Sequence, residues 1–161
     1  MQKINGATII FDFGFLVLAW KKLYFMTEKE LKNKTKVVAI SVARLCQKLV
    51  ANKINNTYID QILRSSASMG ANYRAACRAK STKDFIYKLH VVEEETDETL
   101  FFLELLAEFN EKQKPEMRAL YKETEVILKM IVASIKTSQT KQAIEAVKQS
   151  KIKNRKSKIN E

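Results

Sequence analysis

The stretch ILRSSASMGANYRAACRAKSTKDF, from Ile62 to Phe85, mixes arginines and lysines with serines, alanines and one glycine. Large aliphatic side chains are scarce in it, although it contains no proline to break a helix. A helix of this kind can pack closely against a neighbouring helix, or it can present a surface that holds an anion. The sequence on either side of the stretch decides how much weight each reading carries.

The composition of the whole chain predicts a single all-α domain. Its 161 residues include only three glycines and one proline, with 29% charged and 46% hydrophobic residues. A chain of this length can bury one core, and a mixture so poor in turn formers favours long helices.

Capping signals and apolar spacing divide the chain into four helices. Thr27 and Glu30 fit a capping box, Thr57 and Ser81 are candidate N-caps, and Pro115 suits a first helical turn. We predict an antiparallel up-down-up-down four-helix bundle. The expected helices are 27–51, 57–79, 82–109 and 115–136. The side chains expected in the core are Leu31, Val38, Val42, Leu45, Leu49, Ile59, Ile62, Leu63, Ala67, Gly70, Ala71, Phe85, Leu89, Val92, Leu103, Leu106, Met117, Leu120, Tyr121, Leu128, Ile131, Val132 and Ile135.

The two ends of the chain differ from the body between them. The uncharged run from Phe13 to Trp20 is shorter than the ~20 residues needed to cross a bilayer. Met26 could itself initiate translation, so we expect residues 1–25 to be an extension outside the core. Residues 26–137 are then the bundle, and residues 138–161 a basic tail that we expect to be at best a frayed helix ending in disorder.

Positive charge is the strongest functional indication in the composition. The formal charge is +11, and the last 23 residues carry seven Lys/Arg against two Glu, a net +5. Polyanions such as RNA, DNA or anionic membrane surfaces are therefore possible partners, although such a tail can also serve solubility alone.

Catalytic and metal-binding patterns are weak in this sequence. His90 is the only histidine, and Cys46 and Cys77 stand 31 residues apart without a metal-ligand spacing. The acidic run from Glu93 to Glu98 has no second histidine to complete a di-metal site. We therefore expect no enzyme activity, no metal and no cofactor, with the thiols reduced in a cytoplasmic protein.

Basic residues gather where the second predicted helix turns into the third. Together with the tail, they are the candidate phosphate contacts, unless they simply pair with the acidic run or stay hydrated. The candidate nucleic-acid-binding residues are Arg74, Arg78, Lys80, Lys83, Lys88, Lys151, Lys153, Arg155 and Lys156.

The segment from Ile62 to Leu106, together with Gln61 before it, resembles the signature of the four-helix-bundle family named for intervening sequences in bacterial 23S rRNA genes. The chain departs from that pattern at Ala75, Thr96 and Phe102, where the family tends to have Glu, Ala and Trp. The matching residues are Gln61, Arg64, Ser65, Ser68, Ala71, Asn72, Tyr73, Arg74, Ala79, Ser81, Asp84, Phe85, Lys88, Leu89, Glu95, Glu98, Thr99, Leu103, Glu104 and Leu105.

The resemblance implies a bundle that assembles into a homo-oligomeric ring, typically of five subunits, without known enzyme activity. The family is similar in fold to the accessory variability determinants of diversity-generating retroelements, which associate with a reverse transcriptase and with nucleic acid. A nucleic-acid-binding accessory protein, with RNA the expected ligand, and a protein-interaction scaffold are the two functions that we carry forward. A reverse transcriptase is one possible protein partner, and a membrane is not expected.

Four polar residues within the matching segment suggest a structural network. We expect Arg64, Asn72, Glu95 and Glu98 to form hydrogen-bonded charge pairs between the second and third helices, or across a subunit boundary.

Overall fold

The computed structural model describes residues 26–157, the last seven by their backbone alone. Within that range 89% of the residues are helical and no strand is present. The elements are α2 (Glu28–Cys46), α3 (Lys53–Ala76), α4 (Thr82–Phe109), the short 3₁₀ helix η1 (Glu111–Gln113) and α5 (Lys114–Ser157). The prediction of an all-α four-helix bundle is confirmed. The expected extension 1–25 lies outside the described residues.

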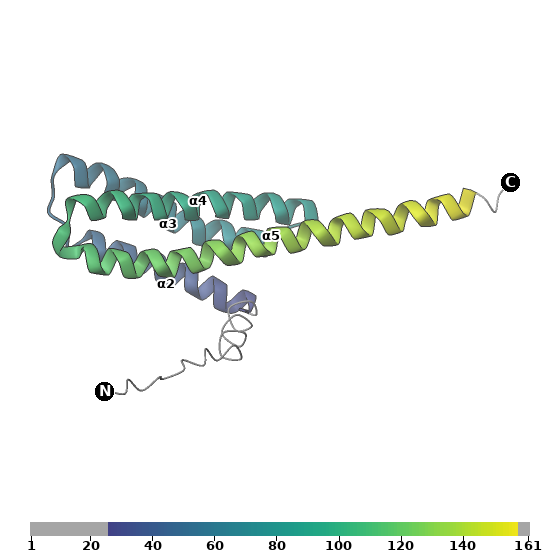
Figure 1. Ribbon diagram of the computed structural model, residues 1–161, viewed down its shortest axis with the longest axis horizontal. Coiled ribbons are helices and arrows are strands. Elements are labelled where there is room, and N and C mark those ends of the chain that lie inside the picture. The colour runs from purple at the N-terminus through teal and green to yellow at the C-terminus, as the bar shows by residue number, and fades with distance from the viewer. Residues whose placement is uncertain (1–25, 158–161) are drawn as a thin grey trace, which may run out of the picture.

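The four helices lie side by side, and consecutive helices run in alternating directions (Figure 1). α4 packs against both α3 and α5, while α2 contacts α3 and α5. The start of α2 and the connection from α3 to α4 lie at one end of the bundle, and the connection from α4 to α5 lies at the other.

Helix starts follow the capping chemistry of the sequence. The Glu30 amide donates to the Thr27 hydroxyl at 3.2 Å and the Thr27 amide donates to the Glu30 carboxylate at 2.6 Å, so the predicted capping box is confirmed. Ser81 caps α4 by accepting a hydrogen bond from the Asp84 amide at 3.1 Å. Pro115 lies in the first turn of α5, as predicted.

The start of α3 differs from the prediction. Asn52, not Thr57, is the N-cap, because its side chain accepts a hydrogen bond from the Asn55 amide at 2.9 Å. The Thr57 hydroxyl instead donates to the Lys53 carbonyl inside the helix. The ends of α2 at Cys46 and α3 at Ala76 also come before the predicted ends, since the chain passes into single turns after each.

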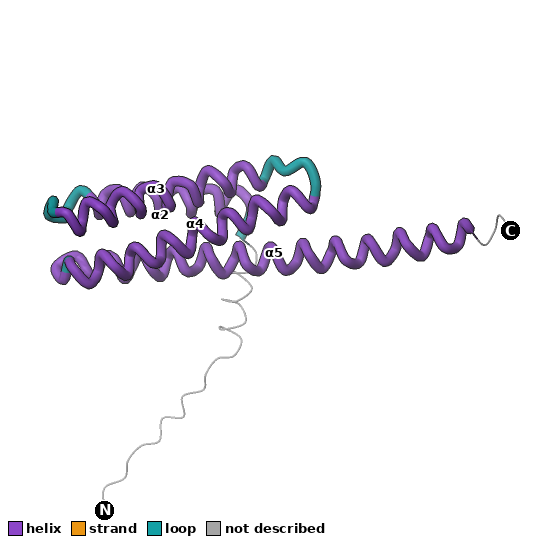
Figure 2. The backbone as a smooth tube through the Cα atoms, turned by 90° about the horizontal axis from the view of Figure 1, so that it is seen from above, coloured by secondary structure: helices purple, strands orange, loops and turns teal. Residues whose placement is uncertain are grey.

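The largest difference concerns the C-terminal tail. α5 is a continuous helix of 44 residues that extends well past the end of the bundle (Figure 2). Our expectation of a helix end near Lys136 is therefore wrong, because the backbone of residues 138–157 is helical. The physical reason is that no glycine or proline follows Pro115, while lysine, glutamine, alanine and glutamate favour a helix.

The core is a continuous apolar cluster contributed by all four long helices. Most of the predicted core residues of α2, α4 and α5 are buried, but Leu63, Ala67 and Ala71 of α3 are exposed. α3 buries Ser65, Ser66, Met69 and Tyr73 instead, a face that contains the small polar residues of the opening stretch. Ile127, fully buried on α5, is a core residue that we did not predict.

Candidate nucleic-acid interface

The turn between α3 and α4 carries an exposed group of cations. Arg78, Lys80 and Lys83 are all exposed there. The turn is held by amide bonds from Arg78 to the Ala75 carbonyl and from Ala79 to the Ala76 carbonyl. We call Arg78, Lys80 and Lys83 the basic corner.

Asp84 fixes the shape of the corner from the α4 side. The Lys80 amide donates to its carboxylate at 3.0 Å, and the Lys88 ammonium pairs with the same carboxylate at 3.0 Å. The backbone hydrogen bond from Lys80 and then the Lys88 contact lower the pKa of Asp84 below its ordinary value. Lys88 is therefore already engaged one turn along α4, whereas the corner cations remain available.

Arg74 does not join the basic corner. Its guanidinium donates to the Gly70 carbonyl at 3.0 Å and lies back along α3. The same guanidinium and the Thr35 side chain of α2 border Gly70, so Arg74 sits at the contact between α2 and α3.

The basic tail and the basic corner lie at the same end of the molecule. Lys151, Lys153, Arg155 and Lys156 belong to the last turns of α5, which pass beyond the connection from α3 to α4 (Figure 1). We call residues 138–157 of α5 the helical extension. Its basic residues therefore lie on a single helix that projects from the end of the bundle at which the corner lies.

Only part of the predicted polar network comes together within the described chain. Arg64 lies 3.9 Å from Glu98, and 71% of the Arg64 side chain is exposed, so this is a loose surface pair. Burial and then the neighbouring charge of Glu98 raise the pKa of Glu95. Asn72 makes no hydrogen bond to these residues in the part of the chain that the structure describes, which leaves the alternative of a subunit boundary untested.

A different polar pair is buried in the bundle, at the end far from the basic corner. The Asn55 and Asn110 amides exchange two hydrogen bonds of 3.0 and 2.9 Å, joining the start of α3 to the end of α4. Asn55 also donates to the Val50 carbonyl, and Asn110 to the Leu106 carbonyl, both at 2.8 Å. The only signal in the sequence is that each Asn stands beside a helix end.

Hydroxyl groups make a second buried contact between α3 and α4. The Thr99 hydroxyl lies 3.1 Å from the Ser65 hydroxyl and also donates to the Glu95 carbonyl at 2.8 Å. Ser65 and Thr99 are both fully buried. Ser65 of the opening stretch therefore lies in the packed contact between α3 and α4.

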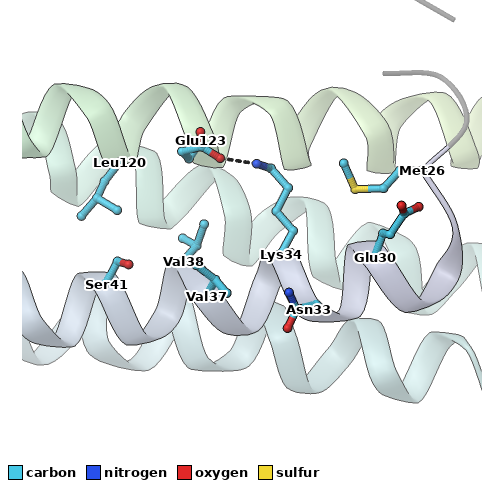
Figure 3. Close-up of a pocket in the computed structure, with 9 residues that line it drawn as sticks. All are labelled: Met26, Glu30, Asn33, Lys34, Val37, Val38, Ser41, Leu120 and Glu123. Carbon is cyan, nitrogen blue, oxygen red and sulfur yellow. Dashed lines mark hydrogen bonds and ion pairs between the residues drawn. The ribbon is translucent and has the colours of Figure 1, made fainter. Parts of the chain in front are cut away.

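An open groove of about 530 Å³ lies between α2 and α5 (Figure 3). Met26, Val37, Val38 and Leu120 supply apolar surface, while an ion pair between Lys34 and Glu123 crosses it. The apolar part of this lining suits contact with another apolar group.

The remaining reactive side chains are separate from one another. Cys46 and Cys77 are both free, and burial raises the pKa of Cys46 to about 11. His90 is exposed, and its Nδ1 lies 3.0 Å from a carboxylate oxygen of Glu93. Within residues 26–157, no group of three potential metal ligands gathers, and no helix is long and apolar enough to cross a membrane.

Comparison with known proteins relates the chain to a family. A solved structure, described as a protein of unknown function from the S23 ribosomal protein family of Bacteroides thetaiotaomicron, is 32% identical. The alignment covers 69% of this chain and 99% of that one, with a TM-score of 0.63. None of the curated proteins matches the chain. The family model of the 23S rRNA-intervening sequence protein matches residues 27–133, which comprise nearly all of the bundle, and the chain therefore belongs to this family.

Proposed function

We propose that this protein is a non-enzymatic, homo-oligomeric accessory factor of the cytoplasm that binds nucleic acid, with RNA the expected ligand. The observation that carries the proposal is that the basic corner and the helical extension lie toward the same end of the bundle, with the extension projecting past the corner (Figure 1). Cations that are far apart in sequence are thereby carried toward one end of the molecule, an arrangement that favours contact with a phosphate backbone at that end.

The basic corner is chemically suited to this task. None of the ion pairs in the described part of the chain includes Arg78, Lys80 or Lys83. Their side chains are exposed, so a phosphate can approach them without breaking an existing contact. Contacts of this kind position a protein on a nucleic acid and read little sequence.

Oligomerisation is the second part of the proposal. The family resemblance supports a ring of about five subunits, and such a ring would repeat the basic end in every subunit. Several weak phosphate-binding sites on one rigid assembly bind a long polyanion more tightly than one site does, because later contacts are intramolecular.

Binding of fluorescently labelled RNA and DNA, measured by anisotropy at several salt concentrations, tests the nucleic-acid part. Each neutralised phosphate contributes about −0.7 to −0.9 to the slope of log K against log salt. The triple variant Arg78→Gln, Lys80→Gln, Lys83→Gln should weaken binding to all sequences and make the slope less steep by roughly 2.

A matched control removes the same number of cations elsewhere. Lys36, Lys53 and Lys122 are exposed on other helices, and their triple change to Gln should alter the binding less. Equal losses for the two triple variants would show that net charge alone drives binding, and the corner would lose its assigned role.

A protein-interaction scaffold is the second candidate function. The groove between α2 and α5 favours it, because Val37 on its wall keeps 48% of its surface exposed. A reverse transcriptase is one conceivable partner for such a surface. Absence of RNA and DNA binding at low salt would refute the first proposal and leave this one.

A further inference from the structure

Within residues 26–157, the helical extension of α5 runs past the ends of the other helices (Figure 1). α5 is 44 residues long, and its last 20 residues, 138–157, form an extension of about 30 Å. Every residue from 139 to 150 is exposed. A helix surrounded only by water gains no packing energy, although packing supplies most helix stability in proteins.

One face of the extension is amphipathic and positively charged. Ile144 and Val147 are 50% and 54% exposed and lie on the same side, three residues apart. Lys141 and Lys148, three residues before and four residues after Ile144, flank this apolar pair. The face therefore fits an apolar surface that is bordered by carboxylates.

Such a surface exists on α4. Between Leu89 and Glu111 the chain has eight carboxylates and no lysine or arginine, in a molecule whose total charge is +11. Phe101 is 52% exposed at the middle of this segment. The exposed residues spaced three or four apart along one side of α4 are Glu94, Asp97, Phe101, Glu104 and Glu108. We call these five residues the acidic stripe.

The other side chains described by the structure leave the acidic stripe largely uncovered. Lys114 approaches Glu108 only to 3.9 Å, and Glu108 remains 71% exposed. Glu94 and Asp97 take part in none of the ion pairs found among residues 26–157. The stripe thus offers an aromatic ring to the apolar pair of the extension and carboxylates to its lysines.

We propose that the helical extension of one copy docks on the acidic stripe of a second copy. This inference rests on the homo-oligomeric part of the proposed function and not on nucleic-acid binding. The extension cannot reach the stripe of its own chain, because α5 continues straight away from the bundle while the stripe runs toward the opposite end (Figures 1 and 2).

The lengths of the two surfaces and the head-to-tail symmetry of the contact are compatible with an assembly of several copies. The segment from Thr140 to Ser150 spans about 15 Å as a helix, and the stripe from Glu94 to Glu108 spans about 21 Å. Each copy gives one extension and receives another, so the contact is head-to-tail. Contacts of this type produce a closed ring when the rotation between copies closes.

Charge reversal on full-length protein tests the contact by size-resolved light scattering. The extension variant Lys141→Glu, Lys148→Glu should raise the concentration for half-assembly at least tenfold at low salt, because carboxylates would then face carboxylates. The control variant Lys36→Glu, Lys122→Glu changes the net charge equally at exposed positions elsewhere and should assemble within twofold of the wild type.

The complementary change reverses the stripe. Glu94→Lys, Asp97→Lys should weaken assembly as the extension variant does, whereas Asp60→Lys, an exposed control on α3, should not. Mixing the extension variant with the stripe variant should partly restore assembly, because each reversed surface meets an opposite charge wherever the two variants are neighbours. This rescue does not depend on the register of the two helices.

The outcomes separate this inference from the proposed function. A monomeric wild type would refute the homo-oligomeric proposal and the docking contact together. An assembled wild type whose size is unchanged in both reversed variants would overturn the docking contact alone. Loss of RNA binding by the extension variant without any change in assembly would support the nucleic-acid role of the extension and would overturn the docking contact.

Discussion

Removing the buried amide pair should reveal how strongly it joins α3 to α4. Asn55 is 1% and Asn110 8% exposed, so neither amide can exchange its partner for bulk water. In Asn110→Ala the Asn55 side chain loses two hydrogen bonds, while its contact with the Val50 carbonyl survives. A buried group left without its partner costs ~1–3 kcal/mol, and a hydrogen bond contributes about 1 kcal/mol net. We therefore expect Asn110→Ala to reduce the free energy of unfolding by about 2–4 kcal/mol.

A double-mutant cycle measured by urea unfolding isolates the pair itself. Asn55→Ala should cost a similar amount, since Asn110 then keeps only the Leu106 carbonyl as partner. In the double variant no orphaned amide remains, so its loss should fall short of the sum of the single losses by about 1–2 kcal/mol. All four proteins are compared at one protein concentration, because assembly would stabilise the folded state by mass action. Strictly additive losses would refute the reasoning that the two amides act as a unit.

For two further substitutions, local geometry and charge predict whether the stability of the folded protein rises or falls. Gly70→Ala should stabilise the protein by about 0.5–1 kcal/mol in thermal or urea unfolding. An added Cβ would make ordinary contacts of 3.5 Å with Arg74 and 3.6 Å with Thr35, and alanine would restrict the unfolded chain. A loss of stability would show that the contact between α2 and α3 has no room for the methyl group. Glu95→Gln should also stabilise at pH 7, because the raised pKa of Glu95 means that the charged carboxylate is disfavoured in the folded state. That advantage should disappear as the pH falls below the ordinary value of 4.5, where the carboxyl group is neutral in both states, and a pH-independent difference would count against it.

The parts of the fold that the sequence predicts well are those with unambiguous local chemistry. α4 begins and ends where the Ser81 cap and the apolar spacing predict, and the Thr27 capping box is present. The start of α3 was missed because asparagines serve equally in turns and at N-caps, and only the three-dimensional position of Asn52 distinguishes the two. The buried face of α3 was misassigned because its serines bury more completely than Leu63, which apolar periodicity alone does not reveal.

The candidate site was predicted less completely than the fold. The sequence brings Arg78, Lys80 and Lys83 together because they are neighbours around one turn. It does not reveal that Arg74 is held by the Gly70 carbonyl, since that depends on the rotamer of a long side chain. That the extension projects at the same end as the corner follows only from the length and direction of α5. The sequence did not predict this length, because we expected the helix to end near Lys136.

The unbroken path of α5 gives the extension a fixed rotational phase relative to the bundle. No glycine or proline interrupts α5 after Pro115, so any twist or bend imposed on the far end is transmitted along the helix to the core. One residue inserted near Thr137 would turn every outer side chain by about 100° and advance it by about 1.5 Å. The packing of α5 in the bundle therefore sets the orientation of the helical extension. Buried residues of the core thus determine the direction from which a partner can approach the extension.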